Sequence, residues 1–239
     1  MISIIIPTLN EEKILEKTLQ SLKEFHGDYE IIISDGKSND KTVEIAKKYT
    51  SKVVIYDGAA RQTIAMARNL GASIASGEYY AFIDADIFIP DINNFFTKII
   101  KNFNKNNRLA GMGVFFDVTP EVATMSDKFF LWFFNWMFYV LNNIFHYGAL
   151  PGEFQFVKAD VFKRLGGYNE KLVAGEDNEF FRRLSKVGQT RIDSTLSVFH
   201  PLRRAHKMGW LSLIKLWTLN SVAMIFFKKS WSNVWEEVR

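Results

Sequence analysis

The 239-residue sequence contains no cysteine, so disulfide bonds and thiolate metal sites are excluded and a reducing cytoplasm is the simplest location. The N-terminal segment 1–7 lacks a basic region and has only a short apolar stretch, which predicts a first strand and not a signal peptide. Acidic residues are also absent between His200 and Lys229, where six Lys or Arg residues occur. This imbalance predicts an anionic partner for the C-terminal part. We expect that partner to be a membrane surface with anionic lipids, and we expect no nucleic-acid partner.

Strand-like and helix-like patterns alternate over the first 110 residues. Apolar runs predict strands at 2–6, 30–34, 52–56 and 79–83. Asn10 is expected to cap a helix with Glu11 and Glu12 in its first turn, Asp40 opens a second helix, and further helices are predicted at 61–75 and 91–106. This rhythm predicts an α/β fold with a mostly parallel, doubly wound central sheet flanked by helices.

Two carboxylates, one residue apart, follow the strand at 79–83. Asp84 and Asp86 are expected at the carboxyl edge of the sheet, where open α/β folds bind ligands. Carboxylate oxygens suit Mg²⁺ or Mn²⁺, and Mg²⁺ is usually held by one or two carboxylates together with substrate phosphates. By itself an Asp-x-Asp sequence is more often an exposed turn with two solvated acids. The metal interpretation therefore depends on the rest of the chain.

Further polar residues are expected near the same edge. Asp35 lies at the tip of the strand 30–34, where its carboxylate can accept hydrogen bonds from a nucleobase or ribose. Arg61 and Arg68 are two turns apart on the predicted helix 61–75 and can share a face. An ordinary β–α loop and a solvated helix face explain these three residues as well.

Two acids and a histidine stand out in the second half. Glu176 and Asp177 open a predicted helix, where acids often only complement the helix dipole. His200 ends the strand-like segment 196–199 and is a candidate metal ligand. A lone histidine is more often structural, so this assignment also needs the rest of the pattern.

Taken together, these motifs resemble the inverting glycosyltransferases of family 2, which have the GT-A fold. The matching motifs, in order, are Ile-Ile-Pro-Thr-Leu-Asn-Glu-Glu at 5–12, Ser-Asp-Gly-Lys-Ser-Asn-Asp at 34–40, Ala-Arg-Asn-Leu-Gly at 67–71, Asp-Ala-Asp at 84–86, Gly-Gly-Tyr at 166–168 and Glu-Asp at 176–177. The resemblance implies that Asp35 and Asp84 hold the nucleoside, that Asp86 binds Mn²⁺ or Mg²⁺ with His200, and that Asp177 is the general base beside Glu176. The donor-binding set predicted on this basis is Pro7, Asn10, Glu11, Asp35, Lys37, Arg61, Arg68 and Asp84.

Two apolar stretches raise the question of a membrane. The segment 129–147 is free of charge and carries ten Phe, Trp or Tyr residues, whereas 208–227 is an apolar helix with a narrow polar stripe and basic flanks that include Arg203 and Arg204. Both fit helices at the bilayer surface. An internal aromatic core, a buried helix or one spanning segment remain alternatives. We expect a GT-A catalytic domain at 1–200, with a nucleotide-sugar half (1–110) and an acceptor half (111–200), followed by a basic amphipathic membrane-associating helical tail at 201–239.

The resemblance implies a metal-dependent, inverting transfer of a sugar from a UDP- or GDP-sugar. The aromatic run and the basic helix indicate a lipid-linked acceptor such as a polyprenyl phosphate or a glycolipid, at the cytoplasmic face of the cell membrane. Two alternatives remain open: a soluble glycosyltransferase that acts on a sugar or protein, and a non-catalytic module that binds a nucleotide-sugar or lipid.

Overall fold

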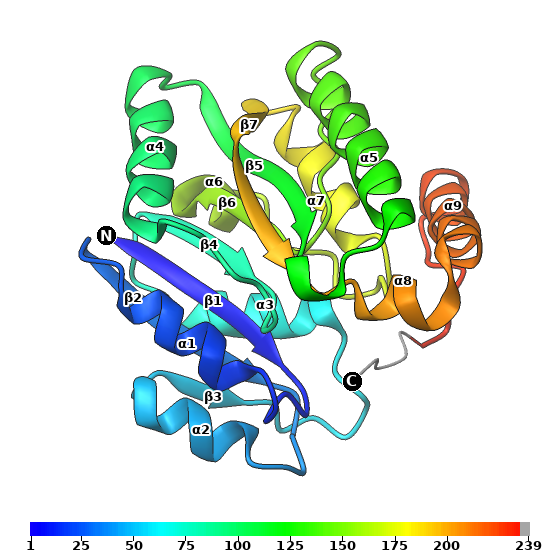
Figure 1. The fold of residues 1–239 in the computed structure, drawn as a ribbon. Helices are drawn as coiled ribbons and strands as arrows, with labels where there is room; N and C mark the ends of the chain where they lie inside the picture. The colour runs from blue at the N-terminus through cyan, green and yellow to red at the C-terminus, as the bar shows by residue number, and fades with distance from the viewer. Residues whose placement is uncertain (235–239) are drawn as a thin grey trace.

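The computed structural model describes residues 1–234 and contains one seven-stranded sheet with the strand order β3-β2-β1-β4-β6-β5-β7 (Figure 1). The strands are β1 (Ile2–Thr8), β2 (Tyr29–Asp35), β3 (Val53–Ile55), β4 (Tyr79–Ile83), β5 (Leu109–Val118), β6 (Phe154–Lys158) and β7 (Gln189–His200). The helices are α1 (Leu15–Lys23), α2 (Thr42–Tyr49), α3 (Ile64–Ser73), α4 (Ile92–Lys105), α5 (Met125–Asn143), α6 (Ala159–Arg164), α7 (Glu176–Leu184), α8 (Arg203–Met208) and α9 (Trp210–Phe227), with a short 3-10 helix at Pro120–Val122.

Strand β6 is the one strand of this sheet that runs against its neighbours. It pairs antiparallel with β4 and with β5, while the pairs β1–β2, β1–β4, β2–β3 and β5–β7 are parallel. The pairing of Ile83 with Phe154 therefore brings the start of β6 beside the end of β4. As a result, the residues just before β6 lie at the same edge as the carboxyl ends of the other strands.

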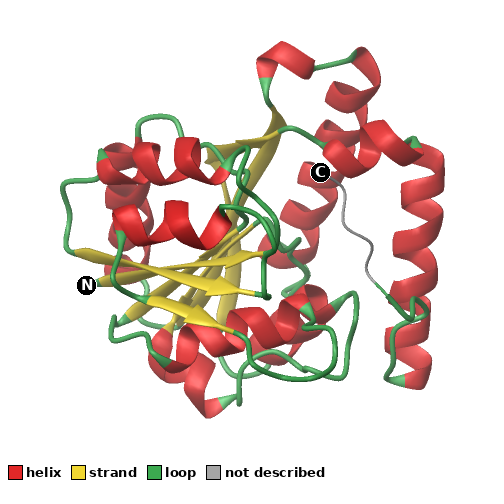
Figure 2. Ribbon diagram, turned by 90° about the horizontal axis from the view of Figure 1, so that it is seen from below, coloured by secondary structure: helices red, strands yellow, loops and turns green. Residues whose placement is uncertain are grey.

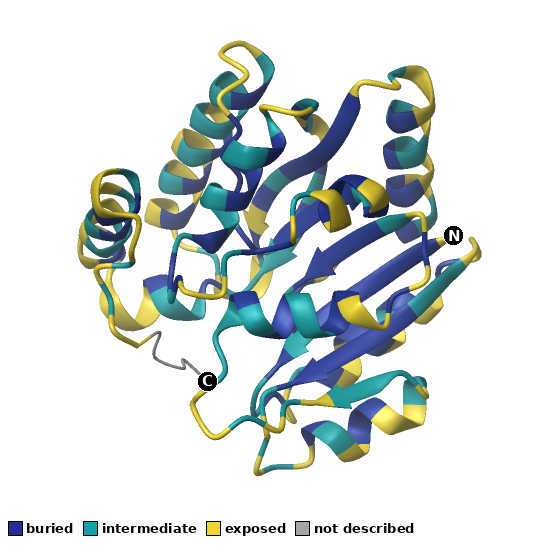
Figure 3. Cartoon of the chain, turned by 180° about the vertical axis from the view of Figure 1, so that it is seen from behind, coloured by how far each residue is buried: buried dark blue, intermediate teal, exposed yellow. Residues whose placement is uncertain are grey.

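Helices cover both faces of the sheet, as Figure 2 shows. Side chains of a strand alternate between faces: Ile4 and Ile6 of β1 belong to the core that includes α1, α2 and α4, while Ile5 belongs to the core that includes α3, α6 and α7. The strands are largely buried, whereas parts of α5 and α9 face outward (Figure 3). The predicted α/β architecture with a mostly parallel sheet is confirmed.

Two predicted helix starts are wrong. Asn10 has a φ of 56° and does not cap α1, which begins five residues later; Glu11 and Glu12 precede that helix. Helix α3 begins at Ile64, where the Thr63 hydroxyl accepts a hydrogen bond from Met66 N (3.2 Å), so Arg61 lies in the preceding loop and shares no helix face with Arg68. A hydroxyl cap stabilises the later start. The predicted start of α4 is confirmed, with Asp91 as its cap.

One buried carboxylate joins α5 to α8 and α9. Asp127, which also closes the capping box of α5 with Thr124, accepts hydrogen bonds from His206 Nε2 (2.9 Å) and Trp210 Nε1 (2.7 Å). Burial raises its pKa, but the hydrogen bonds from His206, Thr124 and Trp210 outweigh that effect and lower the pKa to about 2. Asp127 is thus ionised over the physiological range and holds the ends of α5 and α9 together.

The inner faces of α5 and α9 pack on each other through aromatic rings. Phe130 stacks on Trp210 with ring centroids 4.9 Å apart, and Phe134 meets Trp217 edge-on at 5.6 Å. The outer face of α5 leaves Phe129, Trp132 and Phe133 exposed. Of the helices within residues 1–234, Trp210–Phe227 is the one whose length and composition would allow it to cross a membrane.

Candidate active site

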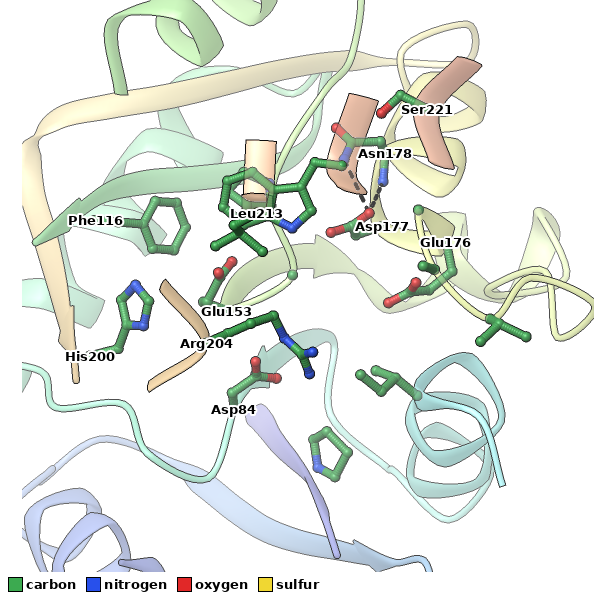
Figure 4. Close-up of a pocket in the computed structure, with 18 of the residues that line it drawn as sticks. Asp84, Phe116, Glu153, Glu176, Asp177, Asn178, His200, Arg204, Leu213 and Ser221 are labelled. Carbon is green, nitrogen blue, oxygen red and sulfur yellow. Dashed lines mark hydrogen bonds between the residues drawn. The ribbon is translucent and has the colours of Figure 1, made fainter. Parts of the chain in front are cut away.

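A cavity of about 810 Å³ opens at the carboxyl edge of the sheet (Figure 4). Its acidic end is lined by Asp84 and Asp86 after β4, by Glu153 before β6 and by Glu176 and Asp177 at the start of α7. These segments are far apart in the sequence and meet because the strand directions described above bring their ends to one edge. The sequence motifs predicted four of these five acids together.

Arg68 of α3 is the buried cation beneath this end of the cavity. Its Nη1 donates to Glu176 Oε1 (2.8 Å), and its Nη2 donates to the carbonyl of Gly152 (2.8 Å) and to Asp84 Oδ1 (3.3 Å). The side chain is only 2% exposed, and the guanidinium lies over the Tyr168 ring, 5.4 Å from its centroid. A planar guanidinium suits this role because its donors lie in a fixed fork.

The pKa values of the carboxyls around Arg68 are raised. Burial raises the pKa of Asp84 to about 6; the charge of Arg68 opposes this shift and that of Asp86 adds to it. Burial and the neighbouring Asp177 raise the pKa of Glu176 to about 7, and burial also raises the pKa of Asp177. Like charges confined at low dielectric disfavour ionisation. Such shifts are typical of functional sites.

Asp177 is held in a defined orientation at the wall of the cavity. Its Oδ1 accepts hydrogen bonds from Asn178 N (2.6 Å) and Asn178 Nδ2 (3.1 Å), as the dashed lines in Figure 4 show. Gly175, with a φ of 82°, turns the chain into α7 just before the two acids. The first turn of α7 thus presents Asp177 to the cavity while Glu176 is tied to Arg68.

Asp86 is paired with a residue from the C-terminal part of the chain. Arg203 of α8 donates to Asp86 Oδ2 from Nε (2.9 Å) and contacts the same oxygen through Nη2 (2.7 Å), and its Nη1 lies 3.1 Å from Glu11 Oε2. The guanidinium therefore bridges the segment after β1 and the segment after β4. The sequence interpretation assigned Arg203 and Arg204 to a membrane-binding flank, but both line the cavity.

The residues available for a divalent cation are Asp86 and His200. Within residues 1–234 no group of three His, Asp or Glu side chains converges to form a complete cage. Asp86 and His200 nevertheless line the same cavity, and burial lowers the pKa of His200, which favours the neutral imidazole that binds metals. One carboxylate and one imidazole fit an ion that completes its coordination with diphosphate oxygens, although such an ion competes with Arg203 for Asp86.

Three of the predicted donor-binding residues do not line the cavity. Asp35 is fully buried, and its carboxylate accepts hydrogen bonds from Thr8 Oγ1 (2.9 Å), Ser38 N (2.8 Å) and Ser38 Oγ (2.6 Å). Lys37 is exposed and donates to the carbonyl of Gly58 (2.7 Å), while Asn10 Oδ1 accepts from the backbone of Asn39 (2.8 Å). These contacts shape the loops beside the cavity. Pro7, Glu11, Arg61, Arg68 and Asp84 do line it.

The far end of the same cavity is apolar. Its walls come from one face of α5 and one face of α9, and they are formed by Leu131, Phe134, Met137, Phe138, Leu141, Leu213, Trp217, Ser221 and Met224. Ser221 and Leu213 lie above Asp177 and Glu153 in Figure 4. One continuous space therefore connects a cluster of acids to an apolar channel between two helices, which we name the α5–α9 channel.

Arg68 is expected to be essential for stability because it is the cation paired with buried Glu176 and with half-buried Asp84. Replacing it in Arg68→Met leaves Glu176 and Asp84 without their partner and should lower the free energy of unfolding by about 3 to 5 kcal/mol. Urea unfolding followed by circular dichroism measures this change. The control Arg108→Met alters an exposed arginine and should stay within about 0.5 kcal/mol of the wild type. Equal effects of the two substitutions would contradict the assignment.

The chain is similar in sequence to several known proteins. Succinoglycan biosynthesis protein ExoA of Rhizobium meliloti (strain 1021) is 27% identical over 229 residues, which cover 87% of this chain and 65% of that protein. A 4,4'-diaponeurosporenoate glycosyltransferase of Staphylococcus haemolyticus is 42% identical over 97 residues, 39% of this chain and 25% of that protein. The chain thus spans between a quarter and two thirds of the length of these relatives.

The fold is shared with solved structures. One of them is the mannosyltransferase PcManGT from Pyrobaculum calidifontis in complex with GDP-Man and Mn²⁺, which superposes with a TM-score of 0.71 at 17% sequence identity. The superposed region covers 95% of this chain and 63% of the mannosyltransferase chain. At that identity the likeness shows the fold alone, and it confirms the predicted GT-A architecture. The model of the family described as "Glycosyl transferase family 2" matches residues 3–165, and the chain belongs to this family.

Proposed function

We propose that the protein transfers a sugar from a nucleotide-sugar to a lipid-linked acceptor, with inversion at the anomeric carbon and with Mn²⁺ or Mg²⁺ bound. The observation that carries this proposal is the single cavity that joins the acidic cluster to the α5–α9 channel. A nucleotide-sugar needs cationic and hydrogen-bonding groups, and a lipid chain needs an apolar wall. The cavity has polar and cationic groups at one end and an apolar wall at the other, so both substrates can meet in it.

The donor is assigned to the end of the cavity near β1 and β4. Pro7, Arg61 and Asp84 line this end, and Arg68 fixes Asp84 from below. Asp86 and His200 are the residues assigned to hold the divalent ion. When bound, the ion supplies Lewis-acid stabilisation of the negative charge on the leaving diphosphate. Arg203 and Arg204 line the same space and supply further positive charge toward that group.

Asp177 is assigned as the group that takes the proton of the acceptor hydroxyl. Asn178 orients its carboxylate through one oxygen. Attack from the side of α7, opposite to the leaving diphosphate, is a single displacement and inverts the anomeric carbon. A carboxylate within hydrogen-bond reach of the attacking hydroxyl typically contributes 10²- to 10⁴-fold, roughly, to the rate.

The acceptor chain is assigned to the α5–α9 channel. Apolar and aromatic side chains line it, in keeping with the rule that ligand sites are mostly apolar with a few well-placed polar groups. The staphylococcal relative, named as a 4,4'-diaponeurosporenoate glycosyltransferase, supports an apolar acceptor. Exposed aromatic residues on the outer face of α5 support an attachment to the membrane surface that supplies the lipid.

Release of nucleoside diphosphate tests the reaction class. The purified protein is incubated with a panel of UDP- and GDP-sugars, Mn²⁺ or Mg²⁺, and a polyprenyl phosphate in detergent. We expect one donor to be cleaved, with stimulation by the lipid and loss of the activity after chelation or in Asp86→Ala. Full activity of Asp86→Ala would contradict the assignment of Asp86 as a metal ligand. If the protein binds a donor but releases no nucleoside diphosphate from any of them, the non-catalytic module would be favoured.

Asp177→Asn is expected to slow transfer to a hydroxyl acceptor by about 10²- to 10⁴-fold because the amide cannot take the proton. Donor affinity should stay within about threefold of the wild type, as measured by titration calorimetry. Asp160→Asn, at an exposed position on α6, is the control and should be fully active. If the acceptor is an ionised phosphate, no proton needs to be removed, and the same substitution should cost much less than 10²-fold.

Ser221→Trp is expected to fill the α5–α9 channel and to block the lipid acceptor without affecting the donor. Ser221 lines the cavity, whereas Lys215 is exposed on the same helix and does not line it, so Lys215→Trp is the matched control. We expect Ser221→Trp to raise the apparent KM for the lipid at least tenfold while the affinity for the nucleotide-sugar is unchanged. An unchanged KM would place the acceptor outside the channel.

Flotation with liposomes separates a membrane-bound enzyme from a soluble one. Vesicles that contain phosphatidylglycerol should carry the wild type to the top of the gradient, and the double substitution Phe129→Ser/Trp132→Ser should abolish this because both side chains are about 60% exposed. Ile55→Ser, at the far side of the sheet, is the control and should float. A wild type that stays at the bottom would favour the soluble glycosyltransferase.

A further inference from the structure

Glu153 lies at the centre of the acidic end of the cavity, between Asp84 and Asp177 (Figure 4). It directly precedes β6, and its carbonyl accepts a hydrogen bond from Asp84 N (3.1 Å). Because β6 runs against β4, this position falls at the carboxyl edge of the sheet. The sequence interpretation gave Glu153 no role, since a single acid before a short apolar run predicts nothing by itself.

Glu153 is half-buried, and one of its two carboxyl oxygens is fully buried. Its Oε2 atom has no hydrogen-bond partner among residues 1–234. Arg68, the nearest buried cation, already donates to Glu176, Asp84 and the carbonyl of Gly152. Buried polar atoms are normally paired, so an unpaired one in a ligand cavity points to a partner that is part of the ligand.

The surroundings of Glu153 favour its neutral form. Burial raises its pKa to about 8, the negative charges of Asp84 and Asp177 add to the shift, and the charge of Arg68 opposes it. A neutral carboxyl has one O–H donor together with acceptor oxygens. A sugar hydroxyl also has one O–H donor and acceptor lone pairs. An ionised phosphate oxygen can only accept hydrogen bonds, and a metal ion binds only lone pairs.

We propose that Glu153 binds a hydroxyl group of the sugar being transferred and thereby helps to select the nucleotide-sugar. In the proposed function the sugar lies between the donor side, marked by Asp84, and the general base, Asp177, and Glu153 lines the same cavity close enough to both carboxylates for their charges to act on it. This inference rests on the proposed function for the identity of the donor. It adds a specificity-determining residue that the family motifs in the sequence do not include.

The test compares the affinity of each sugar nucleotide with that of its nucleotide alone. Titration calorimetry with Mn²⁺ is run on wild type, Glu153→Ala and Glu153→Gln, with UDP, GDP, UDP-glucose, UDP-N-acetylglucosamine and GDP-mannose as ligands. Glu153→Ala should weaken binding of the preferred sugar nucleotide about 10- to 100-fold and leave the parent nucleotide unchanged. Glu153→Gln keeps a donor and an acceptor and should stay within about threefold of the wild type. Glu121→Ala, an exposed acid, is the control.

The outcomes separate this inference from the proposed function, because binding needs neither an acceptor nor turnover. An unchanged ratio of sugar-nucleotide to nucleotide affinity in Glu153→Ala overturns the inference, and so does a parallel loss of both affinities, which would mean a structural role. If Glu153→Ala changes the ratio of sugar-nucleotide to nucleotide affinity as expected but the wild type transfers no sugar, only the proposed function is contradicted. A wild type that binds no nucleotide overturns both.

A second measurement tests the neutral state of Glu153. A carboxyl whose folded pKa lies above its unfolded value costs stability increasingly as the pH rises from about 4.5 to about 8, because the folded state retains its proton. The thermal midpoint of Glu153→Gln should therefore exceed that of the wild type by more at pH 8.5 than at pH 5. The charged groups that act on Glu153 are Asp84, Asp177 and Arg68, and they are present in both proteins. A difference independent of pH would contradict a neutral Glu153.

Discussion

The ion-pair network of Arg68 is the constraint on which the candidate site depends. One guanidinium donates to Asp84 after β4, to Glu176 at the start of α7 and to the carbonyl of Gly152 before β6. In the proposed function, the segment with Asp84 lies on the donor side of the cavity, the segment with Glu176 lies on the acceptor side, and the segment with Gly152 lies between them. Because an unpaired charge at this depth is costly, the three segments cannot separate without exposing or protonating an acid. One buried side chain therefore holds the segments around Asp84, Gly152 and Glu176 together.

The acids gathered at one end of the cavity support the proposed use of a cationic cofactor. Burial and mutual repulsion raise the pKa values of Asp84 to about 6 and of Glu176 to about 7. A bare diphosphate next to these acids would be repelled by those that are ionised. A divalent ion held by Asp86 would add positive charge beside that of Arg203, so we expect donor and ion to bind as one unit.

The sequence alone predicted the local features and the convergence of its ordered motifs, and it missed the contacts made by residues outside those motifs. Apolar runs and ordered motifs predicted the first four strands, the GT-A fold and the convergence of Asp84, Asp86, Glu176 and Asp177. The start of α3 was predicted at residue 61 because the sequence pattern is already helical there, whereas the Thr63 cap makes the helix begin at Ile64. Contacts such as Arg203 with Asp86 join residues 117 positions apart, and no local pattern encodes them. The same holds for Glu153, whose position depends on the reversed direction of β6.

Helix α9 is better described as a wall of the cavity than as an independent membrane segment. Its composition would allow it to span a bilayer, but Trp210 at its start donates to buried Asp127, and Asn220 in its middle bonds the backbone of Trp231 and Ser232. Moving α9 into a bilayer as a separate span would break these bonds and remove one side of the α5–α9 channel. If α9 keeps its inner face on α5 and presents its outer face to the headgroups, the hydrogen bonds of Trp210 and Asn220 and the wall of the α5–α9 channel are both retained. If the acceptor is a lipid, as proposed, this arrangement would let its chain enter the channel from the bilayer along α9 and bring its polar end to Asp177.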